Sequence, residues 1–358
     1  MTQSAWLQRM GLGLLSLRIL LVLLIILALL GVGAPAEAHS KTDVITLLNG
    51  DRITCEIKSL QNGRLSASTD SMGTVDIEWK EIATVDSNYN YEMRLNDGQR
   101  FFGSLGPGSV PGSIHFVDVF GERDLNLDSI VELRPVEDSF ASRTDIYLSA
   151  NYAFTKASGV TQTEFRANMS YENQDALNAL TSRLTVSDTD DESTASSRIN
   201  LSRKVWTDRE AMFRLVFAGH ETNDELALDY RITLGAGIGK YFIDTNRQNL
   251  VASFGLQALE EKSLDGDSDE SIEAVLSAGY SRWRYDSPKL NLLLDASLYP
   301  SLTESGRLRA DSAATLRWEI IRDLYWDVST WGSYDNSTID ATASEFDWGI
   351  TTGLGWEF

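Results

Sequence analysis

Residues Phe346–Phe358, with the sequence FDWGITTGLGWEF, alternate between bulky apolar side chains and small or polar ones. Counting every second residue from Phe346 gives Phe, Trp, Ile, Thr, Leu, Trp and Phe, and the intervening residues are Asp, Gly, Thr, Gly, Gly and Glu. Because successive side chains of a strand point to opposite faces, this pattern predicts a β-strand with one apolar face. Such a face needs either a second sheet or lipid to cover it.

Similar segments precede this strand from Ile146 onward, about twelve in all, and Ile146–Phe154 and Leu290–Leu298 show the alternation clearly. Their connections are of two kinds, which is typical of an outer-membrane barrel with short periplasmic turns and longer outward loops. We expect the last strand to pair with Ile146–Phe154 and close the barrel. The short connections are Glu172–Leu177, Thr207–Glu210, Asp244–Arg247, Asp286–Lys289 and Arg322–Asp323, and the long ones are Asp188–Ser196, Glu260–Ser271 and Asn336–Ser344.

The polar faces of these segments carry charges of both signs, as expected for a lumen that is shielded from lipid. Aromatic residues gather near the strand ends, where an interfacial girdle lies. We therefore predict an all-β fold, a transmembrane antiparallel β-barrel of about 12 strands preceded by two small β repeats. The candidate lumen-lining residues are Glu164, Arg166, Arg183, Arg198, Arg214, Arg231, Asp295, Arg309, Asp311, Arg317 and Glu319.

Ahead of the barrel, the sequence from Lys41 to about Pro135 repeats itself at an offset of about 48 residues. Asn49-Gly50 and Asp97-Gly98 occupy matching positions between alternating runs and suit type I′ hairpin turns. Each repeat is predicted as a small barrel of about five strands, and the stretch RLNDGQRFFG at 94–103 resembles SH3-like and Sm-like barrels. The predicted domains are a signal peptide at 1–38, repeats at 39–87 and 88–138, and the barrel at 139–358.

Residues 1–38 have the features of a secretory signal peptide. Arg9 and Arg18 are basic, Ile19–Leu30 is apolar, and Ala36-Glu37-Ala38 is a small-residue cleavage site. The alternative is an uncleaved anchor, because the apolar run extends through Val32. Either form predicts export.

The overall composition excludes several classes of function. Lys and Arg number 31 against 52 Asp and Glu, a net charge of -21, which argues against nucleic-acid binding, including RNA binding by the repeats. The only cysteine is Cys55, so neither an internal disulfide nor a cysteine zinc cluster can form. His39, His115 and His220 lie far apart in the sequence, and we expect no metal or other cofactor.

The stretches LDYRITLGAGIGKY at 228–241 and LVASFG at 250–255 resemble the family called domain of unknown function 481, often labelled a salt-induced outer membrane protein. The Asn-Gly-Asp-Arg repeat also occurs ahead of barrels in this family. The resemblance implies an outer-membrane β-barrel of a Gram-negative bacterium and supplies no catalytic residue. Trp356 and Phe358 are similar to the terminal signal read by the outer-membrane assembly machinery, which would then be a partner together with lipid and lipopolysaccharide.

Three classes of function remain open from the sequence. The leading one is a non-enzymatic barrel with a structural or narrow-pore role, in which charges either pair across the lumen and plug it or line a water path. The alternative is a barrel hydrolase, a lipase or protease that uses His220 with Glu221 or Asp224. The third is a surface-contact role through acidic loops such as Leu264–Glu270. A periplasmic protein is the expected partner of residues 40–135.

Overall fold

The computed structural model describes residues 40–136, 143–155, 160–173, 175–189, 193–207, 211–224, 227–266, 268–337 and 345–357. Their regular structure consists of β-strands and two short 3-10 turns, and none of these described residues forms a helix able to cross a membrane. The predicted signal peptide, the predicted boundary near residue 139 and Phe358 lie outside the described residues.

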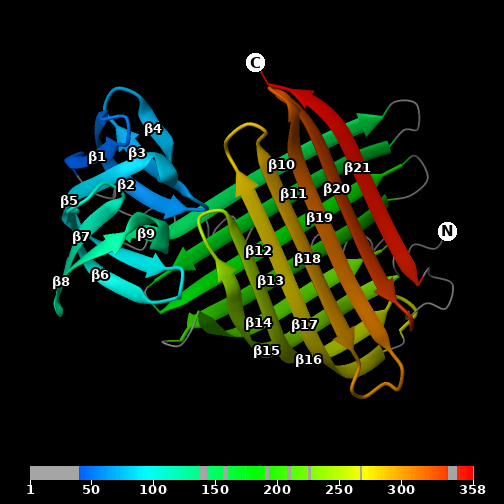
Figure 1. Cartoon of the computed structure of the whole chain (residues 1–358). Helices are drawn as coiled ribbons and strands as arrows, with labels where there is room; N and C mark the ends of the chain where they lie inside the picture. Colours follow the sequence, from blue (N-terminus) through cyan, green and yellow to red (C-terminus); the bar gives the residue numbers. More distant parts are fainter. Residues whose placement is uncertain are drawn as a thin grey trace.

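Residues 40–136 form one module around a nine-stranded sheet, ordered β4-β3-β2-β1-β5-β6-β7-β8 with β9 pairing β2 and β5 (Figure 1). Its elements are β1 (Asp43–Leu47), β2 (Arg52–Gln61), β3 (Arg64–Thr69), β4 (Gly73–Glu78), η1 (Trp79–Glu81), β5 (Ile82–Leu95), β6 (Arg100–Pro107), β7 (Ser113–Asp118), β8 (Gly121–Asn126), η2 (Leu127–Ser129) and β9 (Ile130–Pro135).

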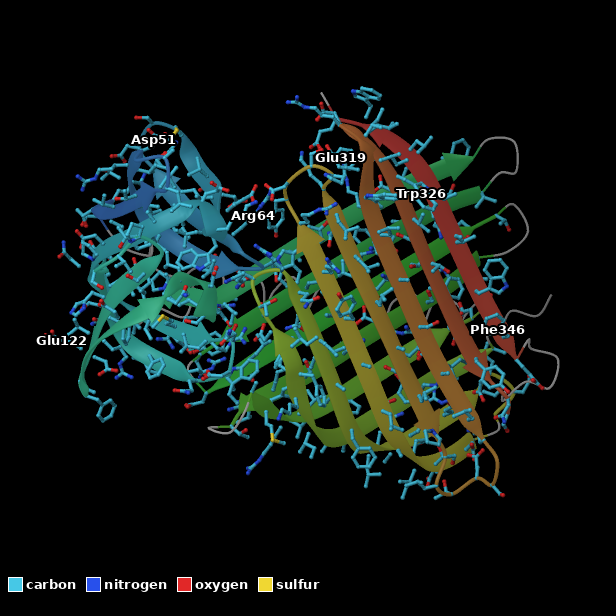
Figure 2. All side chains as sticks on the ribbon, in the orientation of Figure 1. Asp51, Arg64, Glu122, Glu319, Trp326 and Phe346 are labelled. Atoms are coloured by element: carbon cyan, nitrogen blue, oxygen red, sulfur yellow. The ribbon has the colours of Figure 1, made fainter. Side chains whose placement is uncertain are left out.

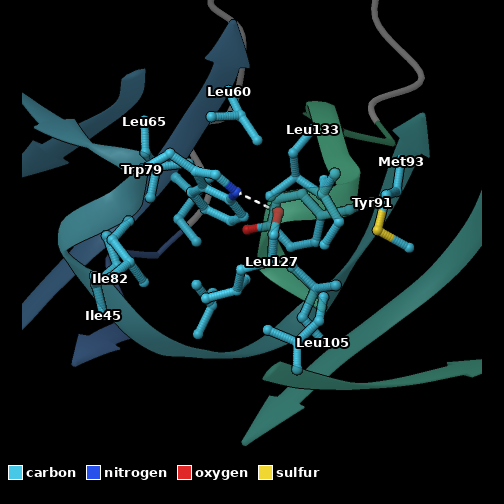
Figure 3. Close-up of a cluster of buried hydrophobic side chains, with 14 of the residues drawn as sticks. Ile45, Leu60, Leu65, Trp79, Ile82, Tyr91, Met93, Leu105, Leu127 and Leu133 are labelled. Carbon is cyan, nitrogen blue, oxygen red and sulfur yellow. Dashed lines mark hydrogen bonds between the residues drawn. The ribbon is translucent and has the colours of Figure 1, made fainter. Parts of the chain in front are cut away.

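The two sequence repeats have the same order of elements, because β5 serves both. β1 to β4, η1 and the first part of β5 are matched by the second part of β5, β6 to β8, η2 and β9. Gly50 and Gly98 sit at matching turns with φ of 92° and 88°, a conformation that glycine adopts without strain. A single core unites both repeats, and it includes Leu60 and Trp79 from the first and Tyr91 and Leu133 from the second (Figure 3). The module is therefore one packing unit.

The remaining strands form a twelve-stranded antiparallel sheet in which each pairs with its sequence neighbours from β10 to β21, and the sheet curls into a barrel (Figure 1). The strands are β10 (Thr144–Thr155), β11 (Val160–Glu172), β12 (Ala176–Asp188), β13 (Ser193–Trp206), β14 (Met212–Asn223), β15 (Leu228–Asp244), β16 (Gln248–Ser263), β17 (Ser268–Arg284), β18 (Leu290–Pro300), β19 (Leu308–Ile321), β20 (Leu324–Asp335) and β21 (Phe346–Trp356).

The seam between the first and last barrel strands differs from our expectation. Within the described residues, β10 forms a ladder with β11 alone and β21 forms one with β20 alone. Alternation of side chains indicates the apolar face of a strand, but it contains no information on backbone pairing across the seam. The described residues thus form no ladder between β10 and β21.

The module lies at the barrel end where β11, β13, β15 and β17 end, and the opposite end is the one where β12, β14, β16, β18 and β20 end (Figure 1). We call these ends the module mouth and the distal mouth. Figure 2 shows Arg64 on the barrel-facing side of the module and Phe346 at the distal end. The predicted loop Glu260–Ser271 is shorter than expected, because β16 and β17 occupy most of it.

Candidate functional site

Three arginines occupy one continuous row on the lumen wall. Arg166 on β11 lies directly opposite Arg183 on β12, which in turn lies opposite Arg198 on β13. The same row then continues across β14, β15 and β16 through Glu221, Arg231 and Glu261. We call Arg166, Arg183 and Arg198 the arginine row. Like charges directly opposite each other on neighbouring strands disfavour the sheet, so the row needs anionic partners.

Carboxylates neutralise the arginine row unevenly. Arg166 Nε lies 2.6 Å from Glu164 Oε1, and Arg198 pairs with Glu221. Arg183 Nε lies 3.8 Å from Glu164 Oε2, too far for a hydrogen bond. Farther along the wall, Arg231 contacts Glu261 Oε1 at 2.5 Å. Arg231 also lies 3.3 Å from Glu221, the carboxylate that pairs with Arg198. The Arg183 guanidinium is thus the least compensated member.

Two hollows lie inside the barrel. The first, of about 440 Å³, borders the arginine row and is lined mainly by hydroxyl, amide and charged side chains of β11 to β14. The second, of about 470 Å³, extends across the lumen from Arg198 and Arg231 to Arg309 and Asp311 on the facing wall. The two hollows share Arg198, Asn200 and Glu221 in their linings, and charged side chains from both walls border the second one.

The facing wall is also held by polar contacts. Arg309 Nη2 lies 2.7 Å from Glu273 Oε2, and Gln257 Nε2 donates to the same carboxylate at 2.6 Å. Ser333 Oγ donates to Asp311 Oδ1 at 2.9 Å. Arg317 and Asp327 are 3.8 Å apart. Asp295 of β18 lies opposite Gly279 of β17.

Arg307, in the connection between β18 and β19, ties the distal mouth together. Although only 5% exposed, its guanidinium contacts four carboxylates from β16, β17, its own loop and β20. The distances are 3.2 Å to Glu261, 3.0 Å to Asp269, 3.1 Å to Glu304 and 3.2 Å to Asp335. Removing one member of such a buried set leaves the others uncompensated, so the arrangement fixes the shape of this mouth.

Three sequence-predicted residues take other positions. Arg214 lies opposite Ile238 on the outer face of β14, because Phe213, Leu215 and Phe217 occupy the lumen face instead. His220 shares this outer face, between Ile199 and Ile232, whereas Glu221 points to the other side. Glu319 is 1% exposed at the module end and accepts hydrogen bonds from the backbone N–H of Lys289 and Asp323, so it holds two turns.

Aromatic side chains narrow the lumen at the module mouth. Trp206, Phe213 and Tyr241 have ring centroids 5.7 to 6.2 Å apart, and Lys204 Nζ lies 4.5 Å from the Phe213 centroid. From the module, Arg100 stacks over Trp206 at 4.5 Å, a favourable cation–π contact. The module therefore covers this part of the module mouth.

A buried set of charges joins the module to the barrel. Arg94 contacts Glu132 at 2.8 Å and also Asp244 of β15, and Arg134 contacts Glu172 of β11 at 2.8 Å. We call the set the docking network, and its members are Glu92, Arg94, Arg100, Glu132, Arg134, Glu172 and Asp244.

The network shifts the pKa values of the module's buried carboxyls in opposite directions. Burial alone would raise the pKa of Glu132, but Arg94 and Arg134 outweigh burial and hold this pKa below its ordinary value. For Glu92, burial prevails over the attraction of Arg100 and raises the pKa. Ionised Glu132 is thus an integral part of the docked state.

Further contacts extend the docked surface across the turns. Asn246 Nδ2 donates to the backbone O of Ile130 at 2.8 Å, and Tyr285 Oη donates to the backbone O of Asn62 at 2.9 Å. Arg64 stacks over the Tyr285 ring at 3.8 Å. Docking therefore involves residues from both repeats of the module.

Several of these residues were not predicted from the sequence. Glu261 was assigned to a loop because it lies in an acidic run, yet it is 1% exposed in the lumen wall. Arg307 follows Ser-Gly in a turn and shows no alternation that would place it. The lumen position of Trp206 and Tyr241 could have been predicted from the sequence. Each lies an even number of residues from a predicted lumen residue on its own strand, Lys204 for Trp206 and Arg231 for Tyr241, and so shares its face.

The glycines of the LGAGIGK stretch explain how aromatic rings fit inside. Gly235 and Gly239 face the lumen on β15, and a Cβ at either would overlap the ring of Phe217 or Phe213. The outer ends of the rings on β14 thus occupy the space that side chains would fill at these two positions of β15, a known way of compensating strand glycines. Within the described part of the chain, no group of three His, Cys, Asp or Glu side chains is arranged to hold a metal.

Comparisons with known proteins place the barrel in a family. The family model described as "Protein of unknown function, DUF481" matches residues 143–358. No curated protein matches the chain. Among solved structures, a NanC porin in a rhombohedral crystal form is similar at 9% identity and a TM-score of 0.36, covering 59% of this chain and 100% of that one. A bacterial polysaccharide outer membrane secretin is similar at 9% identity and a TM-score of 0.34, covering 76% and 100%.

Proposed function

We propose that this chain, which belongs to the DUF481 family of proteins of unknown function, is a non-enzymatic outer-membrane β-barrel that forms a narrow pore covered by its own periplasmic module. The observation that supports it most directly is the separation of faces. Large apolar side chains on the outside of the barrel are exposed, among them Leu234 at 65% and Trp348 at 59%, whereas ion pairs occupy the lumen. A soluble barrel would have to leave that apolar surface in water.

The proposed membrane location implies specific partners. The outer face would contact lipid and, at the distal mouth, lipopolysaccharide, and the β21 end with Trp356 and Phe358 would be recognised by the outer-membrane assembly machinery. A periplasmic protein would bind the module on the surface not covered by the barrel. Membrane fractionation with heat-modifiable gel mobility tests the location, and recovery in the soluble periplasmic fraction would overturn it.

The pore itself is tested by single-channel recording of the purified full chain in planar bilayers. We expect small, brief conductance steps, because the hollows are narrow and the module covers one mouth. Replacing Arg100 by Ser removes its stacking on Trp206 and should lengthen the openings. Arg52→Ser is the matched control, because Arg52 holds the equivalent position in the first repeat, 48 residues earlier, and is exposed. Absence of reproducible steps from all three proteins would reject the pore.

A further inference from the structure

We propose that the arginine row is a binding site for a small hydroxylated organic acid, with Arg183 as the main carboxylate ligand. The proposal adds a ligand to the barrel and does not need the lumen to conduct, so binding and conductance can fail independently. Its basis is the position, exposure and polar surroundings of the row.

The row is accessible from the lumen. The side chains of Arg166, Arg183 and Arg198 are 42%, 59% and 61% exposed, although they belong to a closely packed wall. They line the hollow of about 440 Å³, whose size lies within the range of small-molecule sites, roughly 300–1,000 Å³. A ligand in the lumen can therefore reach the guanidinium groups directly.

The local charge favours an anion. Among the residues lining this hollow, three arginines face two carboxylates, Glu164 and Glu221, which leaves an excess of one positive charge in a chain of net charge -21. Glu221 is shared with Arg231, which weakens its hold on Arg198. A bound carboxylate would relieve the repulsion between neighbouring guanidiniums and supply Arg183 with a planar, two-oxygen partner.

The remaining lining selects for hydroxyl groups. It offers amides and hydroxyls on adjacent strands, which can both donate and accept hydrogen bonds. A small inorganic anion bound to Arg183 would reach fewer of these groups than a polyhydroxylated acid, whose hydroxyls can bond to them while its carboxylate binds Arg183. These side chains are Gln162, Asn168, Thr181, Thr185, Ser196 and Asn200.

Isothermal titration of the refolded full chain in detergent tests the site with three probes. Gluconate is a hydroxylated acid, sorbitol is its neutral counterpart and inorganic phosphate is an anion without carbon-bound hydroxyls. We expect gluconate to bind most tightly, with an affinity that falls as salt is added. Sorbitol or phosphate binding as tightly as gluconate would overturn the proposed ligand class.

Variants identify the residue. Arg183→Gln should weaken gluconate binding at least about tenfold, since a hydrogen bond to a charged group is lost. Arg183→Lys should retain only part of the binding, because it keeps the charge but loses the bidentate contact with the carboxylate. Arg214→Gln is the matched control, since it removes an arginine from the outer face of a nearby strand. Heat-modifiable mobility verifies that each variant is folded. Equal weakening by Arg183→Gln and Arg214→Gln, or no gluconate binding by the parent chain, would reject the proposal, whatever the conductance.

Discussion

Trp79 donates a hydrogen bond through Nε1 to the backbone O of Leu127 at 2.7 Å, and these residues hold the same position in the two repeats, 48 residues apart (Figure 3). A second pair of equivalent residues behaves likewise, because Tyr91 Oη donates to Asp43 Oδ2 at 2.9 Å over the same separation. The repeats thus meet through matching residues about an approximate twofold relationship. This explains why the module has one core.

Replacing Trp79 by Phe should loosen the module, because the buried Leu127 carbonyl loses its partner while the aromatic ring is kept. We expect the free energy of unfolding of the module to fall by about 1–2 kcal/mol, which corresponds to about a 5–30-fold larger unfolded fraction. Cys55 is a direct reporter, since it is fully buried and burial raises the pKa of its thiol to about 12. Maleimide should modify Cys55 faster by this factor, whereas Trp331→Phe, at a 48% exposed barrel position, should leave the rate unchanged.

Gly98→Ala should release the module from the barrel, and Gly50→Ala should not. Both glycines have positive φ, so each alanine incurs a similar backbone cost of about 1–2 kcal/mol. At Gly98, however, the new Cβ would lie 2.5 Å from the backbone N of Ala211, while Gly50 has nothing within 4 Å. Hydrogen exchange should show lost protection at the docked turns in Gly98→Ala alone. Equal protection in both variants would contradict the docked geometry.

The docking network predicts that the free energy of unfolding depends on pH. Because the folded-state pKa of Glu132 is lowered, its charge stabilises the structure above the unfolded pKa of about 4.3, and this contribution is lost as the pH falls through the folded-state pKa. Near neutral pH, Glu132→Gln should cost about 3–5 kcal/mol in unfolding free energy. The difference from the parent chain should shrink as the pH falls below about 4.3 and through the lowered folded-state pKa.

Glu92 has the opposite effect on stability. Burial is the main cause of its raised pKa, which contributes stability below the unfolded pKa that is lost as the pH rises through the folded-state pKa. Burial persists in Glu132→Gln, but the repulsion from ionised Glu132, a smaller cause of the rise, is removed. Glu81→Gln, at a 57% exposed side chain, serves as the control and should track the parent at every pH. A constant Glu132→Gln difference across this range would refute the assignment.

Gly235→Ala should destabilise the barrel by about 1–3 kcal/mol, because the added methyl overlaps the Phe217 ring and forces that ring to shift. Gly353→Ala is its counterpart on β21, where nothing lies within 4 Å of the added Cβ. Urea unfolding of the barrel in lipid vesicles should separate the two variants. Similar unfolding midpoints for the two variants would show that the Phe217 ring does not pack against Gly235.

The sequence predicted the strands well because most barrel segments have one strictly apolar face, as in Leu290–Leu298. The prediction of faces failed on β14, where Phe213, Leu215 and Phe217 are apolar but turn inward. The glycines of β15 open room for those rings, and this depends on a neighbouring strand that the β14 pattern does not contain. Alternation within one segment cannot reveal such compensation.

The candidate site was predicted in part for a related reason. The alternation of side chains predicted that Arg166, Arg183 and Arg198 lie on the polar faces of their strands. Their alignment in one row depends on the backbone register between the strands, which the alternation does not contain. The docking network was missed because its members, such as Arg94 and Asp244, lie far apart in the sequence. Neither residue is unusual in its own segment, and only the fold brings them together.

The docked surface has a consequence for the order of assembly. Its barrel side combines Glu172 from β11, Asp244 from β15 and Tyr285 from the turn before β18, so it is complete only after β11 to β18 have come together. The module precedes all these strands in the chain, yet an unfinished sheet offers it no complete surface to bind. We therefore expect docking to be a late event, so that a bound module marks a barrel whose middle strands are already in register.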